Sequence, residues 1–439
     1  MSNALSVRFT GPLRALPATA RREIVERARS QEDVAVTRVV GQILARVKRE
    51  GDAALVALAR ELDRADLTKL EVPREALEEA RNAIDPEVRR ALERTRANLE
   101  TVHGAFIPRV IEIESEPGIL VGRRPDPLAA VGVYAPGGRA AYPSSVLMGV
   151  VPARVAGVPE IVVCSPPGKN GLPSQVVLAA AAIGGATRVF AIGGAQAIAA
   201  LAFGTESVPR VDRIVGPGNA YVAEAKRQIA GNVGIDAPAG PSEILVIGDD
   251  TANPEHVARE LAAQAEHDPE ASCVALVVGD ALAAQVSEAL TRVVVDRGEV
   301  VSASLSSRGA VLSIESLEEA WPFAADYAAE HLMLLVREPQ ATLPKIRHAG
   351  TVFLGDGSSV AFGDYMTGAN HVLPTAGAGR SFSGLSTLDF VRFTTYQTVT
   401  REAAARMAGD VAVLAEAEGL RNHAAAAAAF SLPGAGGSR

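Results

Sequence analysis

Glu330 and His331 stand side by side in the sequence, immediately before the apolar run that begins at Leu332. A neighbouring acid and base at the lip of an apolar strand are what a proton transfer needs. The pair could therefore serve as a general acid and a general base. A satisfied ion pair at the edge of a strand is the alternative interpretation.

His267 closes the tetrapeptide Gln264-Ala265-Glu266-His267. Positions three apart on a helix share a face, so Gln264 and His267 can point at one ion while Glu266 points elsewhere. Glutamine is an uncommon zinc ligand. A histidine at the end of a helix, without a metal, is the alternative.

Asp364 and His371 lie in a stretch rich in small residues. Carboxylate and imidazole groups suit zinc, manganese or iron, and the alternative is a turn capped by Asp364. His423 follows Glu418 on a predicted helix near the C-terminus, where a lone histidine usually has no chemical role. The remaining histidines stand in charged helical stretches and are expected to be solvated: His103, His256 and His348.

Short β-branched runs separated by Ala-rich helical stretches occur in two successive series, which is typical of βαβ units and parallel sheets. The low aromatic content of 4% also favours buried parallel strands covered by helices. We therefore predict an α/β fold with two doubly wound, Rossmann-like parallel-sheet domains. The runs of the first series are 130–134, 161–163, 188–192 and 213–215, and those of the second are 243–247, 273–278, 310–314, 332–336 and 351–354.

Residues 20–106 are predicted to be helical, because apolar residues recur at three-and-four spacing from Val34 to Val47 and because Asp85-Pro86 is a typical helix start. The turn 236–241 separates the two series of strands, and the Gly-rich C-terminal end is expected to be disordered. The predicted division is an N-terminal arm (1–20), a first α/β domain with a helical segment (21–128 and 237–376), a second Rossmann-like domain (129–236) and a C-terminal helical arm (377–439).

Three strand ends of the first series run into glycine, at 135–138, 193–196 and 216–219. Glycine at such a turn lets a ligand approach the backbone, and the helix that follows offers N–H donors to a phosphate. None of the three carries the full dinucleotide fingerprint of three spaced glycines. A nucleotide crevice at this end of the sheet and a set of tight βα turns both remain open.

The net charge of −8 argues against a nucleic-acid partner and against an anionic membrane surface. The apolar stretch 175–204 is cut by paired glycines into pieces shorter than the roughly 20 apolar residues of a membrane span, so we expect a buried helix–strand–helix. Cys164 and Cys273 each lie in an apolar run and are expected to be buried thiols. Residues 1–20 lack the apolar core of a secretion signal, so a soluble cytoplasmic protein is expected.

Seven motifs in order resemble the histidinol dehydrogenase family over nearly the whole chain. They are Val133–Met148, Gly193–Ile198, Gly216–Val222, Pro238–Glu243, Gln264–His267, Glu330–Leu332 and the segment from Gly363-Asp364-Tyr365 through Asn370-His371-Val372-Leu373-Pro374.

The resemblance implies one catalytic zinc held by Gln264, His267, Asp364 and the partner subunit's His423. It also implies an intertwined homodimer with shared sites, acid–base chemistry by Glu330 and His331, substrate contacts from Ser242, His371 and Glu418, and NAD contacts from Tyr134, Gln196 and Asn219. The metal ligands and His331 would touch the substrate as well. The family's usual proline before the Glu-His pair is Ala329 here, which loosens the turn but removes no reacting group.

The implied reaction oxidises L-histidinol to L-histidine with two NAD. Zinc would orient the substrate through its imidazole and amine. His331 would take the alcohol proton while hydride leaves for NAD, and Glu330 would activate the water that attacks the resulting aldehyde.

Two alternatives stay open. A relative within the family could oxidise another polar alcohol, such as a sulfonated diol, although an anionic substrate should replace acidic contacts such as Glu418 by basic ones. A zinc hydrolase without a nucleotide, with Glu330 as its base, is the second.

Overall fold

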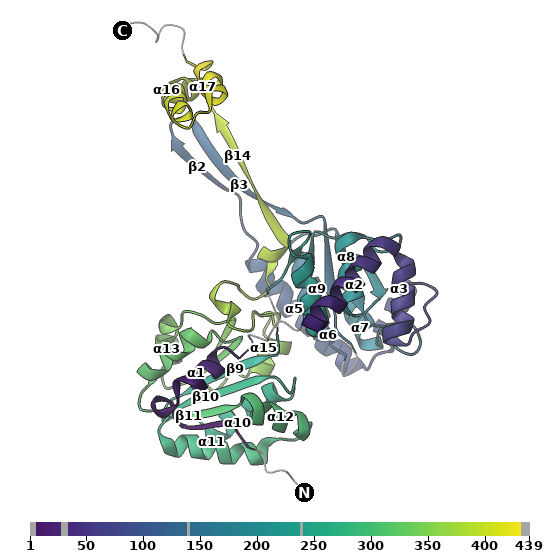
Figure 1. Ribbon diagram of the computed structural model, residues 1–439, viewed down its shortest axis with the longest axis vertical. Helices are drawn as coiled ribbons and strands as arrows, with labels where there is room; N and C mark the ends of the chain where they lie inside the picture. The colour runs from purple at the N-terminus through teal and green to yellow at the C-terminus, as the bar shows by residue number, and fades with distance from the viewer. Residues whose placement is uncertain (1–5, 28–33, 138–140, 238–239, 432–439) are drawn as a thin grey trace. The chain divides into compact units, whose positions relative to one another are not determined.

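The computed structural model of the protein describes residues 6–27, 34–137, 141–237 and 240–431. By their internal contacts these residues form two compact units, and many of their elements are labelled in Figure 1. Unit 1 comprises the residues up to Phe106 together with Leu128–Phe390, and unit 2 comprises Ile107–Pro127 and the residues from Val391 onward. Parts of the turn at 236–241 and of the glycine turn at 135–138 lie outside the described residues, as does the Gly-rich C-terminal end.

The larger parallel sheet of unit 1 has six strands in the order β1-β11-β10-β9-β12-β13. The register places His331 opposite Ile244, so β9 and β12 start next to each other. The strands are β1 (Phe9–Pro12), β9 (Glu243–Gly248), β10 (Ser272–Val278), β11 (Ala310–Ile314), β12 (His331–Leu335) and β13 (Thr351–Leu354).

The second parallel sheet of unit 1 has five strands in the order β6-β5-β4-β7-β8. Its strands are β4 (Ala130–Tyr134), β5 (Glu160–Ser165), β6 (Arg188–Ala191), β7 (Arg213–Val215) and β8 (Gly234–Ile235). In both sheets the first strand of the series pairs with the second on one side and with the fourth on the other, which is the doubly wound topology. The predicted α/β fold is confirmed.

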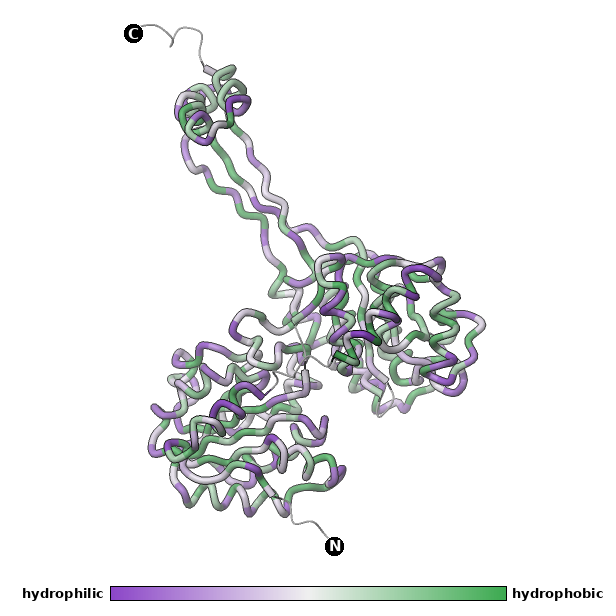
Figure 2. The backbone as a smooth tube through the Cα atoms, in the orientation of Figure 1, coloured by the Kyte–Doolittle hydropathy of each residue, from purple (hydrophilic) through white to green (hydrophobic). Residues whose placement is uncertain are grey.

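Helices cover both faces of the six-stranded sheet (Figure 1). Because successive strand residues point to opposite faces, Leu245 and Ile247 pack in the cluster of α1 (Ala18–Val25) and α13 (Leu317–Tyr327). Ile244 and Val246 pack in the opposite cluster, with α10 (Pro254–Ala265), α11 (Asp280–Val293) and α12 (Gly298–Arg308). Figure 2 shows these strands as hydrophobic segments, as expected of a sheet buried on both faces.

Short elements join the strands of this sheet or follow it. They are η1 (Leu13–Ala15), α14 (Pro339–Thr342), η3 (Leu343–Lys345), α15 (Val360–Tyr365), η4 (Ala378–Arg380) and η5 (Thr387–Phe390).

The helices of the five-stranded sheet are α6 (Pro143–Val155), α7 (Gln175–Gly184), α8 (Gly194–Phe203) and α9 (Ala220–Ile229). The predicted buried helix–strand–helix at 175–204 is confirmed as α7, β6 and α8. No helix in the described part of the chain is long and apolar enough to cross a membrane. Cys164 and Cys273 are buried free thiols, as expected, and burial raises the pKa of both.

The helices between residues 34 and 105 pack with the helices of the five-stranded sheet rather than with the six-stranded one. The predicted division places these helices in the first α/β domain, together with the second series of strands. The apolar stripe of α2, with Val40, Leu44 and Val47, instead joins the core cluster of α6 to α9. Asp85 accepts hydrogen bonds from two backbone N–H groups of the first turn, which confirms the helix start at Asp85-Pro86. The helices are α2 (Val34–Glu50), α3 (Asp52–Leu58), the π-helical η2 (Ala59–Asp63), α4 (Arg74–Ala83) and α5 (Pro86–Ala105).

Unit 2 is an antiparallel sheet in the order β14-β3-β2 with two helices. Its elements are β2 (Ile111–Glu116), β3 (Ile119–Pro127), β14 (Val391–Val399), α16 (Arg401–Ala417) and α17 (Arg421–Ala428). The hydrophobic side chains that it buries are those of four alanines among its described residues, Ala403, Ala408, Ala415 and Ala424. The unit therefore has almost no core of its own.

The structure differs from the expected division at two further places. Residues 9–12, expected in an N-terminal arm, form β1 and pair with β11 at the edge of the six-stranded sheet. Residues 107–127, expected in the first α/β domain, contain β2 and β3, and β3 pairs with the C-terminal β14. Strand pairing outweighs proximity along the chain in both cases. The other boundaries stay a prediction.

His103 is only 1% exposed, so the expectation that it is solvated is wrong. It lies one turn beyond Leu99 on the buried face of α5, with its ring against the edge of Phe106. Neither ring nitrogen hydrogen-bonds to a described residue, and burial lowers the pKa of His103 to about 4. His256 and His348, also expected to be solvated, are half-buried.

Replacing His103 by Leu should remove part of the acid sensitivity of the fold. Below pH 6.5 the unfolded chain binds a proton at this position before the folded chain does, so stability falls as the pH drops towards 4. The difference between the pKa of His103 in the unfolded and in the folded chain corresponds to about 3 kcal/mol of unfolding free energy at most. Urea unfolding should show that the free energy of unfolding falls less between pH 7 and pH 5 for His103→Leu than for the wild type. Equal losses would mean that His103 is not the group responsible.

Candidate active site

Glu330 and His331 lie at the amino end of β12, beside the amino end of β9. Both side chains are buried. His331 points to the same face of the sheet as Met333, which packs in the cluster of α10, and its ring lies 6.0 Å from that of Phe353. The sequence-predicted acid and base are therefore held together by strand pairing.

The hydrogen bonds of His331 determine which of its nitrogens is basic. Its Nδ1 lies 2.9 Å from the carbonyl oxygen of Glu243, which can only accept, so Nδ1 carries the proton in the neutral ring and Nε2 the lone pair. Nε2 is buried, hydrogen-bonds to no described residue and lies 3.6 Å from Asp364 Oδ1. Burial disfavours the charged ring, but Glu330 and Asp364 outweigh this effect and raise the pKa of His331. In the neutral ring, whose Nδ1–H is bound to Glu243, Nε2 is the atom that can receive a proton from a bound molecule.

Glu330 is positioned by the same neighbouring residue. Its Oε2 accepts a hydrogen bond of 2.7 Å from the backbone N–H of Glu243 and lies 3.5 Å from His331 Nδ1. The Glu243 side chain forms a buried ion pair with Arg27. Sequence reasoning quoted Glu243 only as the end of a motif, without a role, and missed Arg27.

His371 lies next to Asp364, but two contacts already occupy its ring. Nδ1 donates to the backbone carbonyl of Asp364 at 2.9 Å, so the lone pair of Nε2 accepts from the Ser145 hydroxyl at 3.1 Å. Burial lowers the pKa of His371. Ser242, half-buried, directly precedes β9. Ser145, quoted above only within a motif, is thus a further residue of this site.

Three of the four residues expected to hold zinc come from helix ends of unit 1. Gln264 lies in the last turn of α10, whereas His267 follows two residues after the helix ends at Ala265, so the two do not share a helix face as expected; Asp364 lies in the last turn of α15. Glu260 of α10 ties the two helices together, because its carboxylate accepts from the backbone N–H of Val360 at 3.0 Å.

The donor atoms fit a zinc ion. The Gln264 side chain is buried, only 2% exposed, in the last turn of α10. Burial raises the pKa of Asp364, but His331, His371 and His267 outweigh it and lower that pKa, so His267 acts on the same carboxylate. Amide oxygen, imidazole and carboxylate are nitrogen and oxygen donors that suit zinc.

Within the described residues there is no group of three His, Cys, Asp or Glu side chains placed to hold a metal. The expected set supplies only two such residues from unit 1, because its third ligand is a glutamine. Its fourth, His423, and the expected substrate contact Glu418 belong to unit 2, where both side chains are exposed.

A large pocket lies at the carboxyl ends of the five-stranded sheet, where β4, β5 and β6 run into their turns. It has a volume of about 890 Å³, which is in the range of small-molecule sites. Tyr134, Gln196 and Asn219, the three residues expected to contact NAD, all line it, together with Gly137 and Gly194. The glycine turns at the end of this sheet thus border a cavity that can hold a nucleotide.

Polar groups in this pocket are already aligned. The backbone N–H of Gly194 donates to the Tyr134 hydroxyl at 3.0 Å, and burial raises the pKa of Tyr134 to about 12. Gln196 donates through Nε2 to Asp63 Oδ2 at 3.4 Å, whereas its buried Oε1 has no hydrogen-bond partner among the described residues. Asn219 caps α9 through its side-chain oxygen. Asp63 is a pocket residue that sequence reasoning missed.

The turn at Gly216 requires glycine. Its φ is +114°, and a Cβ there would lie 2.1 Å from the carbonyl oxygen of Tyr134. The buried pair Lys226 and Asp236 holds this turn by hydrogen bonds to the carbonyl and the N–H of Gly216. Glycine here brings β7 close to β4 beside the pocket.

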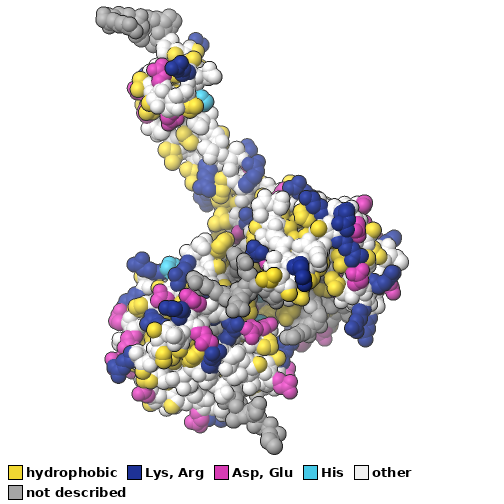
Figure 3. Space-filling model, in the orientation of Figure 1, with side chains coloured by type: hydrophobic (Ala, Val, Ile, Leu, Met, Phe, Trp, Pro, Cys, Tyr) yellow, Lys and Arg dark blue, Asp and Glu magenta, His cyan; other side chains and the backbone are white. Residues whose placement is uncertain are grey.

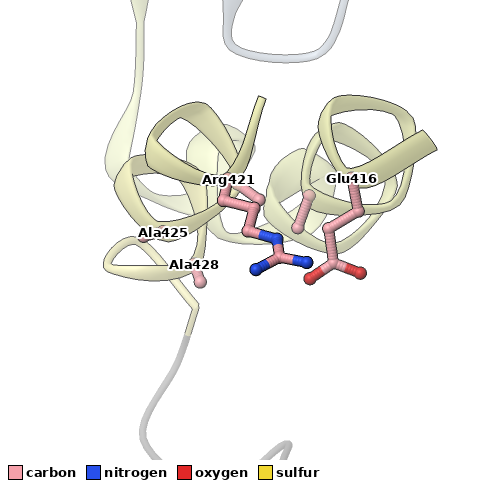
Figure 4. A pocket seen from close by; sticks show the side chains of 6 residues that line it. Glu416, Arg421, Ala425 and Ala428 are labelled. Carbon is pink, nitrogen blue, oxygen red and sulfur yellow. The ribbon is translucent and has the colours of Figure 1, made fainter. Parts of the chain in front are cut away.

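Unit 2 has a small hollow of its own between α16 and α17 (Figure 4). Glu416 and Arg421 point to the same side of it, and alanines form the rest of its lining. Neither Glu418 nor His423 lines it. One carboxylate and one guanidinium that stays protonated, surrounded by alanine side chains, do not make a reaction site.

A buried acid–base pair at the start of two strands and a nucleotide-sized pocket at the end of a second sheet are the parts of an oxidoreductase that uses a dinucleotide. Comparison with known proteins narrows this class. A sequence model of the family described as histidinol dehydrogenase matches residues 26–429. The chain belongs to the histidinol dehydrogenase family, whose members are oxidoreductases that generally use NAD.

Individual relatives agree with this assignment. The chain is 44% identical to the histidinol dehydrogenase of Methanothermobacter thermautotrophicus over 404 residues, which cover 92% of this chain and 95% of the relative. It is 48% identical to that of Halobacterium salinarum over 394 residues, covering 89% and 92%. The crystal structure of histidinol dehydrogenase from Elizabethkingia anophelis matches with a TM-score of 0.91 at 33% identity, covering 98% of this chain and 99% of that one.

Proposed function

We propose that the protein oxidises L-histidinol to L-histidine, with L-histidinal as the intermediate aldehyde, two NAD as hydride acceptors and one water as the source of the second carboxylate oxygen. One observation carries the proposal: the buried Nε2 of His331 has a lone pair and no hydrogen-bond partner among the described residues. Family membership supplies the substrate.

His331 is the base for the alcohol. Its Nδ1–H is bound to the carbonyl of Glu243, so the ring accepts the hydroxyl proton at Nε2 while the carbon loses hydride to NAD. The aldehyde and one NADH result. The carboxylates of Glu330 and Asp364 stabilise the imidazolium that forms.

Glu330 is the base for water. Its Oε2 is bound to the N–H of Glu243, which leaves Oε1 to take a proton from the water that attacks the aldehyde. The hydrate anion formed in this way then loses hydride to a second NAD and its remaining hydroxyl proton, which gives the carboxylate. A zinc hydrolase is not favoured, because the chain belongs to a family of oxidoreductases.

Zinc, when bound, supplies a Lewis acid that holds the imidazole and amine of the substrate. Gln264, His267 and Asp364 would hold it from one subunit, and the partner subunit's His423 would be its fourth protein ligand. Ser242, His371 and Glu418 are proposed to contact the substrate. Glu418 gives the site an acidic group suited to a cationic amine.

The pocket at the five-stranded sheet is the proposed NAD site. The unpartnered Oε1 of Gln196 and the carboxylate of Asp63 can accept hydrogen bonds there, and Tyr134 offers an aromatic wall. The proposed compartment is the cytoplasm, where the two free thiols would stay reduced.

The homodimer is proposed from the surface of unit 2. Large hydrophobic side chains are exposed on its sheet and helices, among them Ile113 at 61% and Leu414 at 67%, and Figure 3 shows hydrophobic side chains gathered along its three-stranded sheet. A unit that buries only alanines and exposes such residues needs a covering surface. A second copy of the chain supplies it and brings His423 to the other subunit's site.

The function is tested by NADH absorbance with a panel of alcohols. Histidinol should give rapid NADH formation, whereas an amino alcohol without the imidazole and a sulfonated diol should give little. Preferred oxidation of the sulfonated diol would assign a different substrate within the family. No NADH with any of them would remove the proposed function.

Chelation of the metal should abolish activity, and added zinc should restore it. The fold should survive, because the ligands stand on helices already packed on the six-stranded sheet. Circular dichroism and metal analysis accompany the assay, with chelator presaturated with zinc as the control. Full activity in a preparation shown to be free of metal would end the zinc assignment.

A further inference from the structure

We propose that Glu243 is a positioning residue for both halves of the reaction, and that Arg27 fixes it in place. This inference rests on the proposed function. Glu243 lies at the first position of β9 and touches no reacting atom; it acts through its peptide groups and its ion pair.

The two backbone groups of Glu243 serve the two reacting side chains. Its N–H donates to Glu330 Oε2 at 2.7 Å, and its carbonyl accepts from His331 Nδ1 at 2.9 Å. A shift of this one residue would therefore move the base for water and the base for the alcohol together. The second contact also keeps the lone pair of His331 on Nε2.

The side chain of Glu243 is held from two directions. Arg27 donates from Nε to Oε1 at 2.9 Å and from Nη2 to Oε2 at 2.5 Å, and both side chains are 2% exposed. The backbone N–H of Ala376, in the chain segment after His371, donates to Oε1 at 2.8 Å. The bidentate pair with Arg27 fixes the orientation of the Glu243 carboxylate as well as its distance.

Arg27 is itself confined. Its guanidinium lies 3.4 Å from the centre of the Tyr327 ring, and its Nη1 donates to the carbonyl of Val25 at 2.9 Å. The Tyr327 hydroxyl in turn donates to Ser272, the residue opposite Glu243 in the sheet.

A buried ion pair is an inefficient way to stabilise a fold, because desolvating two charges offsets most of their attraction. An apolar pair on this face of the sheet, which otherwise packs Leu245 and Ile247 against α1 and α13, would serve stability as well. The pair instead fixes the geometry of the peptide that Glu330 and His331 share. Displacements of about 1 Å in a reacting group can cost about 10²-fold in rate.

The double variant Arg27→Met/Glu243→Leu tests the proposal, because it removes both buried charges at once and leaves neither unpaired. It should stay folded, with unchanged zinc content and KM for histidinol, while kcat falls about 10²-fold for both histidinol and histidinal. The control is Arg188→Met/Glu71→Leu, which removes a bidentate pair of the same geometry elsewhere in unit 1 and should leave kcat unchanged.

A folded double variant with wild-type kcat would overturn the proposal, as would a rise in KM at constant kcat, which indicates substrate binding instead. If the double variant does not fold, Arg27→Lys is the alternative test. Lysine keeps the positive charge but cannot donate the two parallel hydrogen bonds of the guanidinium, so kcat should fall roughly tenfold at constant KM. Unchanged kcat in Arg27→Lys would again overturn the proposal. Wild-type enzyme that makes no NADH from histidinol would be a failure of the proposed function, which the parallel wild-type assay identifies.

Discussion

Glu330→Gln should slow the oxidation of histidinal by roughly 10²–10⁴-fold and affect the oxidation of histidinol to histidinal far less. Glutamine keeps the size of the side chain and an oxygen that can accept from the N–H of Glu243. It cannot take a proton from water. His331, held through Nδ1 by the carbonyl of Glu243, keeps its basic Nε2.

The two steps are separated by supplying either histidinol or histidinal and following the first NADH in each case. Glu330→Asp is the matched control, because it keeps a carboxylate on a shorter stem and should retain more of the aldehyde step than Glu330→Gln does. If histidinal oxidation stayed normal while histidinol oxidation collapsed, the roles of Glu330 and His331 would be reversed.

Co-assembly of two inactive variants should restore activity if the sites are shared. His267→Asn removes a ligand from unit 1, and His423→Asn removes one from unit 2, so each homodimer should be nearly inactive. In a mixed dimer both lesions fall in one site, because the site of the His267→Asn subunit also receives the partner's mutated residue. The other site is whole.

Random pairing makes about half of the dimers mixed, and half of their sites are intact, so roughly a quarter of wild-type activity should return. Mixing two preparations of the same variant is the control and should restore nothing. Mixtures no more active than the parents, with mixed dimers demonstrated, would place His423 in its own subunit's site or outside it.

Most strands of the two parallel sheets could be predicted from the sequence because they form apolar runs, most of them buried on both faces. The strands that were missed lack this signal. β1 contains Gly11 and Pro12, β8 is two residues long, and β14 is mostly polar and buries none of its residues fully. In β2 every residue is exposed, although Ile111, Glu112, Ile113 and Glu114 alternate as strand residues do.

The reacting residues could be found because acid and base are adjacent in the sequence, and the metal ligands because their motifs resemble a family. Arg27 and Glu243 could not, since they are 216 positions apart and meet only when α1 packs on the six-stranded sheet. His103 was assigned to the surface by its charged neighbours, whereas its helical spacing from Leu99 decided its burial.

The most direct test of the account is the amount of NADH formed from a limiting amount of histidinol. A single protein that carries out both oxidations should produce two NADH for each histidinol consumed, with histidine as the product and little free histidinal. One NADH per histidinol with accumulating aldehyde would show that the second oxidation does not take place at this site, and would contradict the roles given to Glu330 and to the shared Glu243 peptide.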